Sequence, residues 1–216
     1  MKTRLAAPRQ DRSQRTLDRI VATAERMLED GTFDEATVQQ IVRQARSSIG
    51  SFYARFPDKD ALLEHLVGRV HDAMLERAAR LRLDRRWQAA DLQARLVAYV
   101  DVVAGWTREH RGILRARLLH HLALGDAAPR AEVEKTRRLV RELRACFDPV
   151  VHQIRSPQPA RALDDALQLI DAMVGTRYLL HGPGLQTFPV SGESAFRRNV
   201  VRAAASLLDD AGGRGR

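Results

Sequence analysis

Residues 47–63, SSIGSFYARFPDKDALL, combine hydroxyl groups, a glycine and an arginine with three aromatic rings. At about 100° per residue along a helix, Phe52 and Phe56 fall on one face. Small residues occupy the opposite face: Gly50, Ser51 and Ala54. Such a face lets a backbone approach base edges in a major groove, and Arg55 beside it can hold a guanine or a phosphate. An ordinary amphipathic connector has the same pattern, so the pattern alone leaves both interpretations open.

The flanking sequence predicts the helices that would position this face. Within residues 13–31, apolar side chains recur at helical spacing, which predicts a helix. Gly31 stands at the position where a glycine typically caps the C-terminus of such a helix. Thr37 and Gln40 form the capping-box pattern of a second helix start. A tight turn at ARSS and a short helix over about 48–56 complete a helix-turn-helix. This motif is the arrangement that presents a short helix to DNA.

Composition limits the class of protein. With 216 residues, 44% hydrophobic and 29% charged, the chain is typical of a globular protein. Charges interrupt every apolar stretch, and the basic start lacks the apolar segment of a signal peptide, so we expect a cytoplasmic protein, nucleoid-associated when bound to DNA. The single cysteine, Cys146, fits a reducing compartment and is expected to be a buried apolar residue rather than a redox sensor.

The net charge of +9 is weak evidence for DNA binding. Residues 1–60 carry eleven basic and nine acidic side chains, so most of the excess lies further along. Residues 1–14 form a basic arm that either enters a minor groove or is an unstructured terminus.

The remaining sequence predicts an all-α protein. Apolar periodicity indicates helices near 91–107, 109–124, 129–155, 159–182 and 192–210, and hairpin turn motifs are absent. Pro149 predicts a kink or break in the third of these. The connectors are RLDRRWQ, ALGDAAP, RSPQP and HGPGLQTFPVSG.

The run IVATAERMLEDGTFDEATVQQIVRQARSSIGSFYARFPDKDALL resembles the DNA-binding domain of the TetR/AcrR transcriptional regulators. The resemblance implies an all-α homodimer of about nine helices per chain that binds double-stranded DNA. A basic arm (1–14) and a three-helix helix-turn-helix domain (15–60) would precede a helical ligand-binding and dimerisation domain (61–216). It implies a one-component regulator, a repressor by expectation, on a near-palindromic operator with an unknown small-molecule ligand. The alternative is a helical ligand-binding or interaction module without specific DNA recognition.

The family's DNA contacts carry over to eight positions: Thr37, Ser47, Ser48, Gly50, Ser51, Tyr53, Arg55 and Lys59. Arg46 is a ninth candidate, on the separate hypothesis that its side chain reaches a phosphate. Two of the nine positions depart from the family pattern, which has Ala-Gly-Val-Ser where this chain has Ala45, Arg46, Ser47 and Ser48. If Arg46 takes the left-handed backbone that glycine accepts, the cost is about 1 kcal/mol, which a phosphate contact can offset. A slightly different turn is the other possibility.

The last two helices are apolar on two sides, which predicts a second partner for each. By resemblance that partner is the same surface of a second subunit, although complete burial within one chain remains the alternative. The expected dimer interface is Leu169, Met173, Leu180, Phe196, Val200, Ala204 and Leu207. Candidate ligand-pocket residues are Trp106, His110, Phe147 and Tyr178, each of which can equally be core.

No catalytic, metal or cofactor site is expected. The sequence has no phosphate-binding glycine loop, no paired zinc histidines and no nucleophile elbow. His120 and His121 are adjacent, so a helix points them in different directions. A small helical enzyme is therefore the least favoured interpretation.

Overall fold

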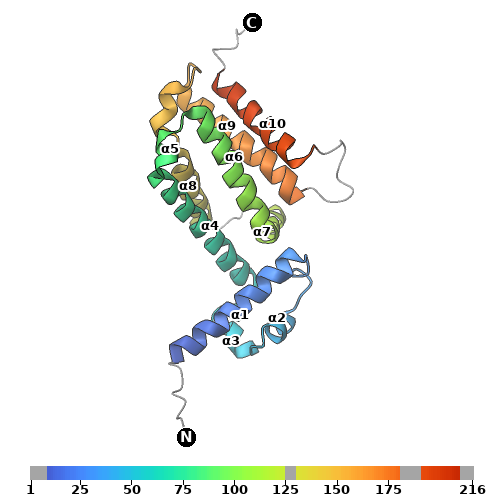
Figure 1. Cartoon of the computed structure of the whole chain (residues 1–216). Coiled ribbons are helices and arrows are strands. Elements are labelled where there is room, and N and C mark those ends of the chain that lie inside the picture. The colour runs from blue at the N-terminus through green and yellow to red at the C-terminus, as the bar shows by residue number, and fades with distance from the viewer. Residues whose placement is uncertain (1–8, 125–129, 181–190, 210–216) are drawn as a thin grey trace. The chain divides into compact units, whose positions relative to one another are not determined.

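The computed structural model describes residues 9–124, 130–180 and 191–209. These residues form ten α-helices, one 3₁₀ helix and one π-helical segment, so the chain is all-α in the part described (Figure 1). No helix of this part is long and apolar enough to cross a membrane. Arm residues 1–8, the connector at 125–129, and residues 181–190 and 210 of the predicted segments lie outside the described residues.

The chain divides into two compact units. Unit 1 comprises residues 1–69 and 112–123, and unit 2 comprises residues 70–111 and 124–216. Residues 112–123 are thus grouped with the N-terminal helices although they lie far along the chain.

Unit 1 contains α1 (Arg9–Glu29), α2 (Val38–Gln44), α3 (Ile49–Tyr53), the first part of α4 (Lys59–Leu83) and most of α7 (Arg111–Leu124). The first three helices pack against one another (Figure 1). Their contact surface is the predicted apolar face, whose fully buried side chains include Ile20, Ile41 and Phe52, and Leu62 and Leu66 of α4 are fully buried as well. Burying such side chains contributes about 1.5–3 kcal/mol each.

Unit 2 is built on α6 (Leu92–Glu109), α9 (Pro159–Gly175) and α10 (Glu193–Leu208), which lie side by side (Figure 1). Unit 2 also contains the rest of α4, α5 (Arg85–Ala89), α8 (Arg130–Ala145), the 3₁₀ helix η1 (Asp148–Gln153) and the π-helical η2 (Thr176–Leu180). Arg95 is 2% exposed and donates hydrogen bonds to the carbonyls of Ala90 (3.0 Å) and Cys146 (2.5 Å). It thereby joins the start of α6 to the turn after α8.

Three predicted boundaries differ from the structure. The first helix begins at Arg9, inside the expected arm. The predicted connector RLDRRWQ contains all but the last residue of α5, because Asp84 caps this helix by accepting from the backbone of Arg86 and Trp87. The predicted helix at 129–155 ends at Ala145, and a 3₁₀ helix with Pro149 at its start follows. The break confirms the expected effect of this proline.

Candidate nucleic-acid interface

The start of α2 is fixed by a reciprocal cap. Thr37 Oγ1 accepts a hydrogen bond from the backbone of Gln40 (3.2 Å), and Gln40 Oε1 accepts one from the backbone of Thr37 (2.7 Å). Thr37 is exposed. The predicted capping box is therefore confirmed, and it sets the residue at which α2 begins.

The turn between α2 and α3 contains a left-handed arginine. Arg46 has φ 49°, and among the described residues no other non-glycine residue has a positive φ. The Ser47 amide donates to the Val42 carbonyl (2.8 Å), and the Arg46 amide donates to the Arg43 carbonyl (3.2 Å). These two bonds form a Schellman motif, whose left-handed position usually holds glycine. The left-handed alternative for this turn is therefore confirmed, and the Arg46 side chain is exposed.

Ser48 and Ser51 organise the start of α3. Ser48 Oγ accepts from the backbone of Ser51 (3.1 Å) and lies 2.9 Å from its hydroxyl. Gly50, between them, is exposed, and a Cβ added there would meet no atom within 4 Å. No steric contact with the described residues therefore requires glycine at this position. The open space allows the α3 backbone to approach another molecule closely.

The aromatic residues of α3 divide between core and surface. Phe52 is fully buried, with its ring centroid 5.6 Å from that of Phe56. Tyr53 is 54% exposed and meets Phe52 edge to face at 5.5 Å. The Tyr53 ring is thus held in place by the core while its hydroxyl remains available to a phosphate.

Two predicted contact cations are bound within unit 1. Arg55 donates to the carbonyls of Ser51 (2.8 Å) and Ser13 (2.7 Å), and also to the Ser13 hydroxyl. Lys59 donates to the carbonyls of Phe33 (2.8 Å) and Asp34 (2.9 Å). Arg55 fastens α3 to α1, and Lys59 fastens α4 to the segment before α2. Both side chains position the motif, which sequence spacing did not indicate.

Ser47 differs in orientation from the other predicted contacts. Its hydroxyl is buried and has no hydrogen-bond partner among the described residues. The side chain therefore lies where an apolar group would pack, and it presents no hydroxyl to the surface.

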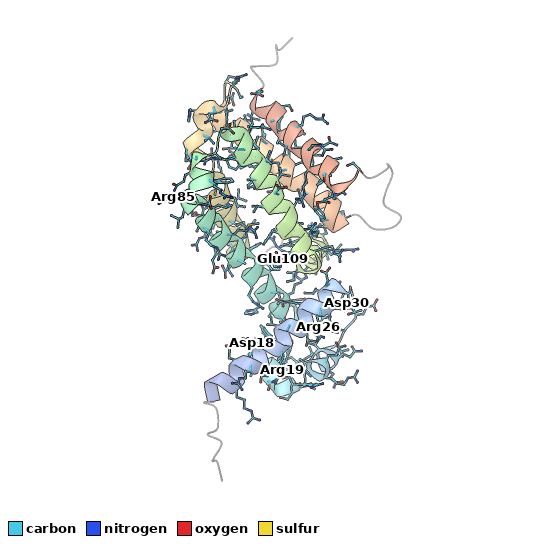
Figure 2. The ribbon with its side chains drawn as sticks, viewed as in Figure 1. Asp18, Arg19, Arg26, Asp30, Arg85 and Glu109 are labelled. Carbon is cyan, nitrogen blue, oxygen red and sulfur yellow. The ribbon has the colours of Figure 1, made fainter. Side chains whose placement is uncertain are left out.

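Arginines outside the predicted set also border the motif. Arg43, in the last turn of α2, is exposed, and its side chain makes no hydrogen bond or ion pair with the described part of the chain. Arg19, labelled on α1 in Figure 2, also donates to the Ala45 carbonyl (3.1 Å). This hydrogen bond supports the turn. Arg43 lies three residues before Arg46, a spacing that the sequence alone shows but does not distinguish from a solvated helix face.

The predicted ligand residues do not converge in unit 2. Trp106 and His110 border a cavity of about 480 Å³ together with Arg77, Arg80 and Glu109. Phe147 is fully buried and packs edge to face on Trp87 and Tyr99. The Tyr178 hydroxyl donates to Glu193 (2.5 Å). Burial and the Glu193 hydrogen bond raise the pKa of Tyr178. Phe147 and Tyr178 thus have structural contacts in place of a shared cavity with Trp106.

The predicted dimer residues also separate into two groups. Phe196, Val200 and Ala204 are buried in the core of unit 2. Leu180 and Leu207 are exposed, while Leu169 and Met173 are half-buried. Only the second group presents a side chain to a further molecule.

The capped α2, the Schellman turn and the exposed small face of α3 define a helix-turn-helix DNA-binding protein. Residues 20–66 match the family model described as "Bacterial regulatory proteins, tetR family". This part of the chain is thus similar to the DNA-binding domain of TetR-family regulators.

Comparison with solved structures supports the all-α fold of this chain. A crystal structure from Mesorhizobium loti, of a protein proposed to be a TetR-family transcriptional regulator, superposes with a TM-score of 0.65. It shares 17% sequence identity, and the superposition covers 91% of this chain and 96% of that chain. No match was found among the curated proteins.

Proposed function

We propose that this protein is a ligand-responsive repressor that binds a near-palindromic DNA operator as a homodimer. The observation that carries the proposal is the α3 surface, where Gly50 faces open space beside the exposed Tyr53. A short helix of this kind can enter a major groove, and a two-fold dimer can place two such helices in successive grooves, about 34–36 Å apart.

The proposed contacts follow from exposure and bonding. Ser48, Gly50 and Ser51 would face base edges, while Thr37, Arg46 and Tyr53 would contact phosphates. We add Arg43, because it is exposed and carries no carboxylate partner within the described residues. We assign Arg55 and Lys59 to holding the motif, and we leave out Ser47 because its hydroxyl is buried.

The dimer would form through the exposed side of α9, η2 and α10, which carries Leu169, Met173, Leu180 and Leu207. In the proposed mechanism, a ligand bound in unit 2 favours a conformation in which the two DNA-binding motifs lose their groove spacing. This requires different ligand affinities for the two conformations.

Fluorescence anisotropy with duplexes from upstream of the protein's own gene tests DNA recognition. We expect the purified protein to prefer one upstream duplex over an unrelated duplex by about 10³ or more, with a steep salt dependence. Tyr53→Ala should weaken binding at least about tenfold, because it removes a hydrogen bond to a charged phosphate. Equal weak binding to all duplexes would favour the module without specific DNA recognition.

Gly50→Ala separates close approach from folding. We expect it to preserve or raise stability by about 0.5–1 kcal/mol, since alanine favours helix over glycine. We also expect it to lower operator affinity by tenfold or more, because the new methyl group would meet the DNA. Gly105→Ala on α6, where a Cβ likewise meets nothing within 4 Å, is the matched control and should leave DNA binding unchanged. An unchanged operator affinity for Gly50→Ala would contradict the proposed orientation of α3.

A further inference from the structure

A cavity of about 340 Å³ lies between α6, α8 and α9 of unit 2. Its volume is within the range of about 300–1,000 Å³ that is typical of small-molecule sites. Apolar side chains form much of its wall: Val140, Leu143 and Leu167. The polar side chains that also border it are Tyr99, Arg144, Asp164, Gln168 and Asp171.

Tyr99 is a largely buried polar side chain that borders this cavity. Tyr99 is 2% exposed, and its ring packs edge to face on Phe147 with centroids 5.5 Å apart. Its hydroxyl has no hydrogen-bond partner within the part of the chain that the structure describes. The hydroxyl is not one of the fully buried side-chain atoms without a partner, so it keeps accessible surface, and solvent or a bound molecule in the cavity can accept or donate its hydrogen bond.

Arg144 and Asp164 neutralise each other at the cavity wall. Arg144 Nε donates to Asp164 Oδ1 (2.6 Å), and its Nη1 lies 3.4 Å from Asp148 Oδ1. The guanidinium charge is thus already balanced by two carboxylates. Arg144 therefore does not provide a free cation for an anionic ligand.

Asp171 is the carboxylate of the cavity lining whose charge is not balanced by an ion pair with a described residue. It has no ion pair or hydrogen bond with any described residue. Asp171 keeps exposed surface at the cavity rim, but the protein atoms around its carboxyl group desolvate it and raise its pKa to about 6. Burial, followed by the negative charge of Asp171, raises the pKa of Tyr99. The Asp171 carboxylate and the Tyr99 side chain therefore border the same cavity and are close enough for the charge of Asp171 to affect the pKa of Tyr99.

We infer that this cavity binds a small organic cation, an amine with an apolar body, through the Asp171 carboxylate and the Tyr99 hydroxyl. The apolar body would pack against Val140, Leu143 and Leu167, and the ammonium group would donate hydrogen bonds to Asp171 and Tyr99. This inference rests on the proposed function, because it names the chemical class of the ligand that would regulate DNA binding.

Calorimetry with the full chain at pH 7.5 tests the charge preference. The probes are 2-phenylethylamine and hexylamine, each compared with the alcohol of the same carbon skeleton, and phenylacetate as the anion. We expect at least one amine to bind about tenfold or more tightly than its alcohol and the anion. The inference is overturned if neither amine binds more tightly than its alcohol.

Variants locate the site. Asp171→Asn should remove the amine preference and leave the binding of the alcohols unchanged, and Tyr99→Phe should weaken amine binding about threefold or more. Asp165→Asn is the matched control, because Asp165 is an exposed carboxylate of the same helix outside this cavity. Circular dichroism melting checks that each variant is folded. Retention of the amine preference by Asp171→Asn would contradict the assignment.

The affinity should also depend on pH. The other ionisable side chains of the lining are Tyr99 on α6, Arg144 on α8 and Asp164 on α9. Below pH 6 the Asp171 carboxyl is protonated in the free protein, so amine binding should be about tenfold weaker at pH 5 than at pH 7.5. Alcohol binding should not change in this interval. Equal amine affinity at the two values would contradict the role of Asp171.

The operator anisotropy assay separates this inference from the proposed function. Specific DNA binding without an amine preference overturns the inference alone. An amine preference without specific DNA binding supports the cation site and contradicts the proposed function. Release of the operator duplex by the amine, but not by its alcohol, supports both.

Discussion

Arg46 combines a backbone conformation that lowers the stability of the turn with a side chain that can raise DNA affinity. The Schellman turn puts its backbone in the left-handed region, which disfavours a residue with a Cβ, while its exposed side chain is free to reach a phosphate. Neighbouring Ser47 adds a buried hydroxyl without a partner in the described residues. The turn is therefore less stable than the sequence pattern of the family would make it, and DNA binding is the function that would compensate.

Arg46→Gly should have effects of opposite sign on stability and on DNA affinity. We expect the free energy of unfolding to rise by about 1 kcal/mol, because glycine relieves the left-handed strain. We expect operator affinity to fall, and its salt slope to decrease by about 0.9, because one phosphate contact is lost. Chemical denaturation and anisotropy across a salt series measure the two. Arg46→Lys retains the charge and the Cβ and should change neither greatly; an unchanged salt slope for Arg46→Gly would contradict the phosphate contact.

At the scale of elements, α7 is joined to α1 through a contact that depends on Gly112. A Cβ at this position would lie 2.6–2.8 Å from backbone atoms of Leu28 and Glu29. The Gly112 amide also donates to Glu29 Oε2 (3.1 Å), which satisfies one of the free amides at the start of α7. Residues 112–123 belong to unit 1 because these two backbones approach so closely.

Gly112→Ala should therefore destabilise the protein by about 1–3 kcal/mol, since a methyl group cannot fit against fixed backbone atoms without moving a helix. Thermal and denaturant unfolding measure this loss. Gly105→Ala on α6 has open space for its methyl group and should be neutral or slightly stabilising. Equal stability of the Gly112 and Gly105 variants would show that α1 and α7 separate at no cost.

At the scale of the whole molecule, η2 and α10 of unit 2 carry exposed apolar side chains outside the core of this unit. Leu180 is 44% exposed and Leu207 is 36% exposed, whereas Phe196, Val200 and Ala204 of α10 are at most 9% exposed. A self-complementary contact through the exposed group is the arrangement that we propose for the homodimer.

Leu207→Arg should weaken dimerisation about tenfold or more, because a two-fold contact would bring two like charges together and lose two apolar side chains. Sedimentation equilibrium measures the dissociation constant. Leu83→Arg is the control, since Leu83 is 78% exposed at the end of α4. A monomeric wild-type protein, or a Leu207 variant that dimerises like the wild type, would contradict this interface.

The amino-acid sequence alone determined the all-α fold, the helix-turn-helix and the break near Pro149. Helical periodicity, the Thr37 cap and proline geometry act within a few residues, so local sequence is sufficient to predict them. Tertiary structure decided which of the predicted site residues stay exposed and which bond or pack within their own unit. Arg55 bonds to Ser13, 42 residues earlier, and Phe147 and Val200 enter the core of unit 2. The Asp171 cavity likewise needs three helices that are distant in sequence. A residue's partners over such separations depend on how the helices pack, which local spacing does not specify.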